Sequence, residues 1–215
     1  MKKGRYFFLF LIISFSCRNE SLKIVDNDER IDLNTSFDII EKHIYASEYD
    51  SAQIKINQVL LIDSNNVKLK VLQGILYKST EHFSKSLFYF NQLLQNDRVE
   101  LPYIYAMRAE VYAKLNRKKS AFIDLDSLLS ISQDTFNYFF VRSNVHLFLR
   151  EFDSSLYCIN QLENDFNNKG LFFYQKAFIY LSKGDSISFC KNYQKAIENG
   201  FEVDSMFNFC NRRYY

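Results

Sequence analysis

The sequence contains few of the residues that interrupt helices: among its 215 residues are one proline, Pro102, and five glycines. A β-sandwich or a dinucleotide-binding α/β domain needs more turn residues than this. Hydrophobic residues make up 47% of the chain, which is enough for a core and argues against global disorder. The scarcity of glycine and proline therefore favours helices joined by short turns, and so an all-α fold.

Residues that form metal sites and catalytic motifs are also scarce. The three histidines, His43, His82 and His146, do not lie at metal-ligand spacing, and the sequence has neither Cys-x-x-Cys nor His-Glu-x-x-His. It also lacks a P-loop, a Gly-rich dinucleotide loop and Gly-x-Ser-x-Gly. Asp124 and Asp126 lie two apart on an expected helix, so they point to different sides. We therefore expect no metal, no cofactor and no catalytic residues.

The positive charge of the chain is concentrated at its N-terminus. The formal net charge is +2, but Lys2, Lys3 and Arg5 fall in a first segment without acidic residues. Subtracting these three from the 27 basic residues leaves one fewer than the 25 acidic ones. A nearly neutral chain lacks the electrostatic attraction that nucleic-acid binding requires, so we expect no nucleic-acid partner.

The first residues have the three zones of an export signal. Residues 1–5 are basic, residues 6–15 are mostly apolar, and a polar stretch follows Cys17. The apolar run is about half as long as the roughly 20 residues that a membrane-spanning helix needs. It fits the hydrophobic region of a secretory signal.

The end of this segment resembles the lipobox of bacterial lipoproteins, in which a cysteine after a small residue is lipidated and becomes the new N-terminus. Residues 14–17 read Ser-Phe-Ser-Cys. The resemblance implies a signal peptide over 1–16, a lipid on Cys17 and a flexible tether over 17–32. The protein would then be anchored in the cell envelope, at the periplasmic face of the outer membrane or at the cell surface. The first two lipobox positions depart from the usual leucine and small residue, so a conventional cleaved signal and an uncleaved anchor are the alternatives.

The rest of the chain repeats itself about every 34 residues. A ring-bearing residue recurs in step at His43, Tyr77, Tyr112, His146 and Tyr180. Small residues that permit close helix packing recur at Ala52, Ser86, Ala121 and Ser155. In the fifth repeat Phe189 stands at this position, which leaves the packing of the last unit open. Apolar residues at three-four spacing within each repeat predict helices.

These patterns resemble the tetratricopeptide repeat. The resemblance implies an α-α superhelix of five helix pairs, at 33–66, 67–100, 102–135, 136–169 and 170–203, followed by a capping helix over 204–215. The proline that often ends the second helix of such a unit is missing throughout. A single unit cannot bury its apolar face alone, so neighbouring units must stack.

In tetratricopeptide arrays the first helix of each unit lines the concave face. Carried over to this sequence, the resemblance implies a partner-binding groove lined by Phe37, Tyr45, Tyr103, Phe140, Asn144, Phe148, Tyr174 and Phe178. Exposed aromatic clusters commonly mark interaction sites, so we expect an apolar or aromatic peptide, or a helix, to bind between units three and five. The alternative is that these aromatic side chains pack between neighbouring helices or beneath the capping helix.

Three cysteines follow Cys17. Export places the protein in an oxidising compartment, where disulfides persist. Cys190 falls on the second helix of the last unit and Cys210 on the expected capping helix, so we expect a disulfide between them. The alternative is two buried thiols that act as small hydrophobic side chains. Cys158 is then an unpaired, inert cysteine.

Together these features predict an interaction scaffold or adaptor of the bacterial cell envelope that binds a protein or peptide partner and catalyses no reaction. The architecture is also similar to that of short tetratricopeptide lipoproteins in outer-membrane and pilus assembly machines, which makes membership of such a machine the alternative. Likeness of fold alone does not carry function. An accessory envelope enzyme is the third and weakest hypothesis.

Overall fold

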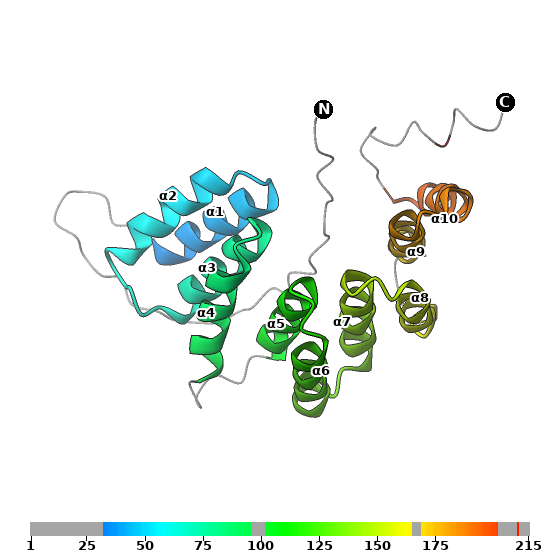
Figure 1. Cartoon of the computed structure of the whole chain (residues 1–215). Helices are drawn as coiled ribbons and strands as arrows, with labels where there is room; N and C mark the ends of the chain where they lie inside the picture. Colours follow the sequence, from blue (N-terminus) through cyan, green and yellow to red (C-terminus); the bar gives the residue numbers. More distant parts are fainter. Residues whose placement is uncertain (1–31, 96–101, 165–168, 202–209, 211–215) are drawn as a thin grey trace.

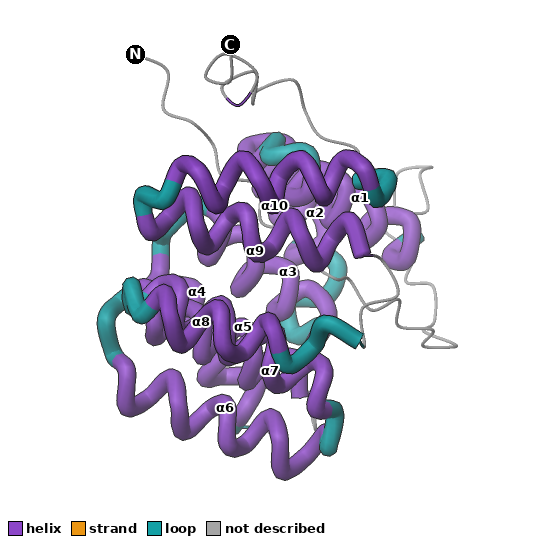
Figure 2. The backbone as a smooth tube through the Cα atoms, turned by 90° about the vertical axis from the view of Figure 1, so that its right-hand side faces the viewer, coloured by secondary structure: helices purple, strands orange, loops and turns teal. Residues whose placement is uncertain are grey.

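The computed structural model describes residues 32–95, 102–164, 169–201 and 210. In these residues the chain forms ten helices and no strand. Successive helices follow a curved path, as Figure 1 shows, and the view turned by 90° shows neighbouring helices running alongside one another (Figure 2). The all-α fold predicted from the sequence is confirmed for this part of the chain.

The helices pack in consecutive pairs, one pair to each predicted unit. The pairs are α1 (Leu33–Tyr45) with α2 (Tyr49–Leu60), α3 (Val67–Ser79) with α4 (Phe83–Leu94), α5 (Pro102–Lys114) with α6 (Lys118–Ser132), α7 (Thr135–Phe148) with α8 (Phe152–Asn160), and α9 (Lys169–Lys183) with α10 (Ser186–Glu198). Helices α7 and α9 each begin one residue before the expected start of their unit. The expected signal peptide, Cys17, nearly all of the tether and all of the expected capping helix except Cys210 lie outside the described residues.

Polar side chains begin several of these helices. The Asp32 carboxylate accepts hydrogen bonds from the backbone N–H groups of Asn34 and Thr35 at the start of α1. Asn66, Asp134 and Asp185 cap α3, α7 and α10 in the same way. A side-chain acceptor at this position satisfies a backbone donor that has no partner within the helix. The starts of α1, α3, α7 and α10 are therefore encoded locally.

One turn geometry joins the two helices of every unit. A residue with positive φ follows the first helix at Ser47, Glu81, Asn116, Arg150 and Gly184, with φ between 57° and 84°. In each unit the N–H of the next residue donates to the carbonyl of the recurring ring-bearing residue, as from Glu48 to His43 at 2.8 Å and from Asp185 to Tyr180 at 2.9 Å. This is the hydrogen bond of a Schellman motif. The ring-bearing residue of the repeat is therefore the residue whose carbonyl closes the turn.

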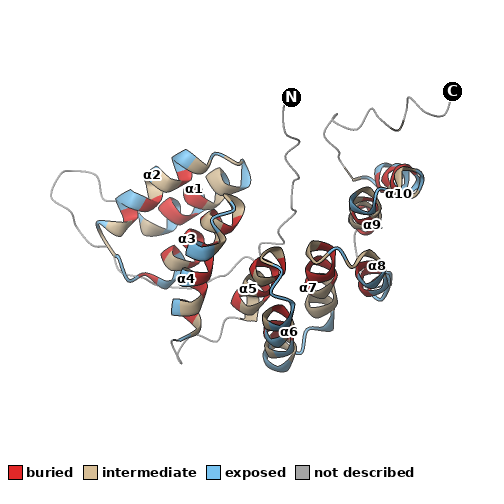
Figure 3. Ribbon diagram, in the orientation of Figure 1, coloured by how far each residue is buried: buried red, intermediate tan, exposed pale blue. Residues whose placement is uncertain are grey.

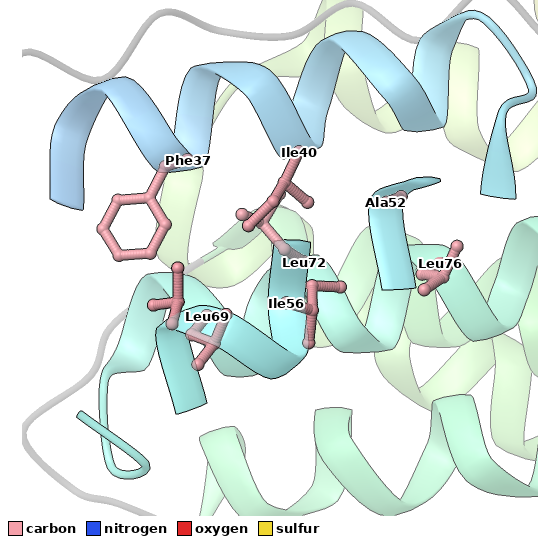
Figure 4. Packing of buried hydrophobic residues seen from close by; sticks show 8 residues of the cluster. Phe37, Ile40, Ala52, Ile56, Leu69, Leu72 and Leu76 are labelled. Carbon is pink, nitrogen blue, oxygen red and sulfur yellow. The ribbon is translucent and has the colours of Figure 1, made fainter. Parts of the chain in front are cut away.

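The core lies between the paired helices, where their buried faces meet (Figure 3). Ala52, Ser86, Ala121 and Ser155 are all fully buried, which confirms their expected place at the helix contacts. Across from Ser86, a Cβ atom on Gly74 would lie 2.4 Å from the Phe90 ring, so this contact has no room for a side chain. The first two units share one cluster, in which Phe37 and Ile40 of α1 lie over Leu69 and Leu72 of α3 (Figure 4).

The fifth unit packs as a close pair although Phe189 stands where the other units have a small residue. The Phe189 side chain is buried together with Ala177 and Tyr193, and its ring lies 5.5 Å from the Tyr193 ring. In the structure Cys190 and Cys210 form a disulfide, with their Cα atoms 5.4 Å apart. The Phe189 side chain is therefore part of the packed contact between α9 and α10.

Candidate binding surface

The first helices of the units form the inner side of the curve. Helix α1 contacts α3, α3 contacts α5, and α5 contacts α7, while each of α3, α5, α7 and α9 also packs on the second helix of the preceding unit. In Figure 1, α5 and α7 lie on the inner side of the arc, and α6 and α8 lie on its outer side. The residues predicted to line a groove all lie on these first helices.

Phe37 does not line a binding surface. Its side chain is 2% exposed and belongs to the core between the first two units. Lys68 covers the ring, with Nζ 5.1 Å from its centroid, and also lies 3.3 Å from the Glu41 carboxylate. The assignment of Phe37 to the groove was therefore wrong, because the repeat position faces the next unit here. Tyr45, on the last turn of the same helix, is 53% exposed.

A line of buried polar side chains crosses the inner helices of units two, three and four. Lys78 on α3 donates to one carboxylate oxygen of Glu110 on α5. The Asn144 amide on α7 donates to the other oxygen at 2.9 Å. The three residues are 5%, 7% and 9% exposed. Asn144, predicted as a partner contact, is therefore already engaged within the protein.

Lys114 extends this line toward the surface between two aromatic rings. Its Nζ lies 5.4 Å from the centroid of Phe83 and 4.9 Å from the centroid of Phe148. Burial lowers the pKa of Lys114, and the carboxylates of Glu110 and Glu81 oppose this shift. An ammonium group held against aromatic faces is stabilised by their quadrupoles. The half-buried Phe148 ring thus borders a cationic position on the inner side.

The aromatic side chains of units three to five are half-buried. Tyr103 packs against the cluster of α3, α4 and α5. Phe140 and Phe178 pack against the cluster that joins α7, α8 and α9. The Tyr174 ring stacks on Phe201 at 4.4 Å, and burial raises the pKa of its hydroxyl. Tyr103, Phe140 and Phe178 therefore contribute to packing between neighbouring helices, as one of the two sequence-based alternatives expected, and each keeps part of its surface accessible.

Sequence reasoning missed the buried ion pairs. Lys78 and Glu110 stand at inner-face positions of the repeat, yet nothing in their spacing of 32 residues marks them as partners. Arg108 and Asp124 form a second buried pair, with Nε–Oδ2 and Nη2–Oδ1 distances of 2.8 and 2.6 Å. Asp126 is exposed, so the expectation that Asp124 and Asp126 point to different sides is confirmed. The available signal was the three-four spacing of Asp124 with Ala121 and Leu128, which are buried on the same face of α6.

Among the residues that the structure describes, no group of three or more His, Cys, Asp and Glu side chains could hold a metal ion. No helix of the described segments combines the length and the hydropathy needed to cross a bilayer.

Stacked helix pairs with this turn and this inner face define the tetratricopeptide-repeat fold, and solved structures show the same fold. A tetratricopeptide repeat protein from Parabacteroides merdae superposes with a TM-score of 0.62 at 16% identity, over 77% of this chain and 64% of that one. PilW, described as a widely conserved type IV pilus biogenesis factor, superposes with a TM-score of 0.58 at 16% identity, over 77% of each chain.

Sequence comparisons add little to the fold. No family model matches the chain. A 3'-5' exonuclease DinG from Staphylococcus haemolyticus is 31% identical over 78 residues, which is 36% of this chain and 8% of the exonuclease. The chain thus spans a small part of that relative, and just under two thirds of the Parabacteroides protein.

Proposed function

We propose that this protein is an interaction scaffold that holds a protein or peptide partner on the inner side of its curve. The observation that carries the proposal is the row of half-buried aromatic rings on consecutive first helices, Phe140 and Phe148 on α7 and Phe178 on α9, with the Lys114 ammonium next to Phe148. Aromatic side chains that keep exposed surface on a rigid support are the usual anchors of protein interfaces. In this proposal the scaffold binds a partner and catalyses no reaction.

The surface favours a partner segment that carries aromatic or aliphatic side chains. The rings of Phe140 and Phe178 offer apolar contacts next to the cluster of α7, α8 and α9. The buried line from Lys78 to Asn144 fixes the spacing of the inner helices, because its groups bond to one another across three units. A preorganised surface of this kind loses little entropy when a partner binds.

Site-specific photocrosslinking in intact cells tests this proposal. A photoreactive phenylalanine replaces Phe148 in one variant and Phe88 in another; Phe88 is 57% exposed on α4, outside the inner side. We expect a discrete crosslinked partner from position 148 and not from position 88, identified by mass spectrometry. Identical products from both positions, or none from position 148, would reject the inner side as the binding surface.

A paired alanine variant separates binding from folding. Phe140→Ala with Phe148→Ala should abolish the crosslinks formed from a third inner position, Phe178, while the helical circular dichroism signal is retained. The matched control is Phe88→Ala, which should change neither. Loss of the helical signal in the double variant would mean that the two rings serve the core, against the proposal.

We further propose that the scaffold works in the bacterial cell envelope, held there by a lipid on Cys17. This rests on the basic, apolar and Ser-Phe-Ser-Cys zones of residues 1–17. Metabolic labelling with an alkynyl fatty acid should mark the wild-type protein and not Cys17→Ala. Equal labelling of both would exclude Cys17 as the attachment site.

The likeness to PilW favours a place in a pilus or outer-membrane assembly machine as the second candidate.

A further inference from the structure

The repeat places an arginine at the same position in units three and four. Arg108 on α5 and Arg142 on α7 each stand eight residues before the left-handed residue of their unit, Asn116 and Arg150. Their partners on the second helix differ. Asp124 on α6 stands eight residues after Asn116, whereas the corresponding residue on α8 is Cys158. The guanidinium groups of Arg108 and Arg142 therefore occupy the same repeat position but have different neighbours.

In unit three each of the three guanidinium nitrogens of Arg108 donates a hydrogen bond. Its Nε and Nη2 donate to the two oxygens of Asp124 at 2.8 and 2.6 Å, and its Nη1 donates to the Asn91 side chain at 2.7 Å. The Asp124 side chain is 2% exposed. This fork geometry is the one with which arginine binds a planar carboxylate.

In unit four the corresponding carboxylate is missing. Arg142 Nη1 donates to the Tyr138 hydroxyl at 3.0 Å, but Arg142 Nε is buried and has no hydrogen-bond partner. Cys158 is a buried free thiol there, and burial raises its pKa, so it supplies no negative charge. A buried donor that lacks an acceptor costs free energy until something supplies one.

The same guanidinium borders an open pocket of about 300 Å³. Its other lining residues are His146, Asp153, Ser154, Tyr157 and Cys158. The Asp153 carboxylate already binds Lys183 on α9, at 2.6 Å. The hydroxyl groups of Ser154 and Tyr157 can donate hydrogen bonds to an anion.

We propose that this pocket between α7 and α8 binds a carboxylate group of a protein or peptide ligand, which supplies Arg142 with the kind of acceptor that Asp124 supplies to Arg108 one unit earlier. The bound carboxylate accepts from Arg142 Nε, the donor left without a partner, once a rotation of the Arg142 side chain brings this buried atom to the pocket. A carboxylate fits better than a phosphate, because the acceptor of Arg108 in unit three, Asp124, is a planar group with two oxygens in an enclosed space. The site is separate from the inner aromatic surface, so either can fail without the other.

Asp126 is the competing acceptor within the chain. It stands one unit after Asn91, the residue that contacts Arg108 Nη1, and its side chain is exposed. Arg142 Nη1, the atom in the corresponding place, is bonded to Tyr138 instead. The variant Asp126→Asn therefore tests whether the chain satisfies Arg142 by itself.

Nuclear magnetic resonance of ¹⁵N-labelled full-length protein follows the Nε–H signals of Arg142 and Arg108, assigned from Arg142→Lys and Arg108→Lys. Sodium acetate is added at constant ionic strength, with acetamide as the neutral control and inorganic phosphate as the other anion. We expect a saturable shift of the Arg142 signal with acetate, a weaker one with phosphate, and no response to acetamide. The Arg108 signal should stay in place, because its Nε–H already donates to Asp124.

Cys158→Asp rebuilds the unit-three arrangement and is the decisive variant. It should raise the melting temperature and weaken the acetate response by about tenfold or more, since an internal carboxylate now occupies the donors. Asp126→Asn should leave the acetate response as in the wild type. The proposal would be overturned if the Arg142 signal did not respond to acetate, responded to phosphate alone, or moved no more than the Arg108 signal. It would also be overturned if the Arg142 signal were already shifted in Asp126→Asn before any acetate is added.

Discussion

Lys78 and Glu110 form an ion pair between the second and third units with both side chains almost wholly buried, at 5% and 10% exposure. Burial lowers the pKa of the Lys78 ammonium, and Glu110 opposes that shift. Removing one partner leaves the other charge buried without compensation, so Glu110→Leu or Lys78→Met should each lower the free energy of unfolding by about 3 kcal/mol.

The double variant Lys78→Met, Glu110→Leu should recover most of that loss, because apolar side chains of similar volume often replace a buried pair without cost. Urea denaturation of the four proteins measures the coupling. Losses that simply add in the double variant would show that the two groups do not interact. Asn144 loses its acceptor whenever Glu110 is changed, so some of the loss should persist.

The Arg108–Asp124 pair should be as sensitive. Asp124→Ala leaves a largely buried guanidinium without its two short hydrogen bonds, and we expect a loss of about 3 kcal/mol in urea denaturation. Asp126→Ala is the matched control on the same helix, and its exposed side chain predicts a change within about 0.5 kcal/mol. Similar losses in both variants would contradict the assignment of Asp124 to the core.

The left-handed turn residues predict stabilising changes. Glu81 and Arg150 have φ of 61°, a conformation that side chains other than glycine adopt at a cost. Glu81→Gly and Arg150→Gly should therefore raise the free energy of unfolding by about 0.5–1 kcal/mol each. Gly184→Ala, at φ 84° in the fifth unit, should have the opposite effect. Thermal melting measures all three, and a destabilising Arg150→Gly would mean that the Arg150 side chain contributes contacts that the turn geometry does not reveal.

These turns explain how much of the fold could be predicted. The 34-residue spacing of His43, Tyr77 and their counterparts fixed all five units, because each of these residues closes the same turn through its carbonyl group. The backbone geometry of this turn recurs with the repeat whichever side chain stands at the position, so the spacing of these residues was enough to locate the turns. The spacing could not show which inner-face side chains are buried, since Phe37 and Asn144 depend on what the neighbouring unit places opposite them. Pairing across units is specific to each interface, and a single sequence does not display it.

His146 predicts a pH dependence of stability. Burial lowers its pKa, while the Glu151 carboxylate, 2.8 Å from Nδ1, opposes the shift and Arg142 and Lys118 add to it. Its folded pKa therefore lies below its unfolded value, so the unfolded chain binds more protons near pH 6. Stability should rise with pH through this range and be lost as pH falls below about 6.5.

The measurement is urea denaturation between pH 5 and 8. His146→Gln should flatten the acidic side of the stability profile relative to the wild type. His43→Gln is the matched control: His43 has the same contact with Glu48 at 2.6 Å in the first unit, but its side chain is 30% exposed, against 9% for His146. A wild-type profile retained in His146→Gln would assign the pH dependence to other groups.

The Cys190–Cys210 disulfide closes the end of the helical array. It links α10 to a residue 20 positions further on, and Cys210 packs against the cluster of Phe189 and Tyr193. Cross-linking a loop of about 20 residues restricts the unfolded chain and should contribute roughly 3 kcal/mol. Cys210→Ser should lower the free energy of unfolding by about that amount. Reducing agent should bring the wild type to the level of the variant and leave the variant unchanged, which separates loss of the bond from loss of a packed sulfur.

Apart from Cys17, unreduced denatured protein should expose one titratable thiol, that of Cys158. A count of three would show that the bond does not form in solution.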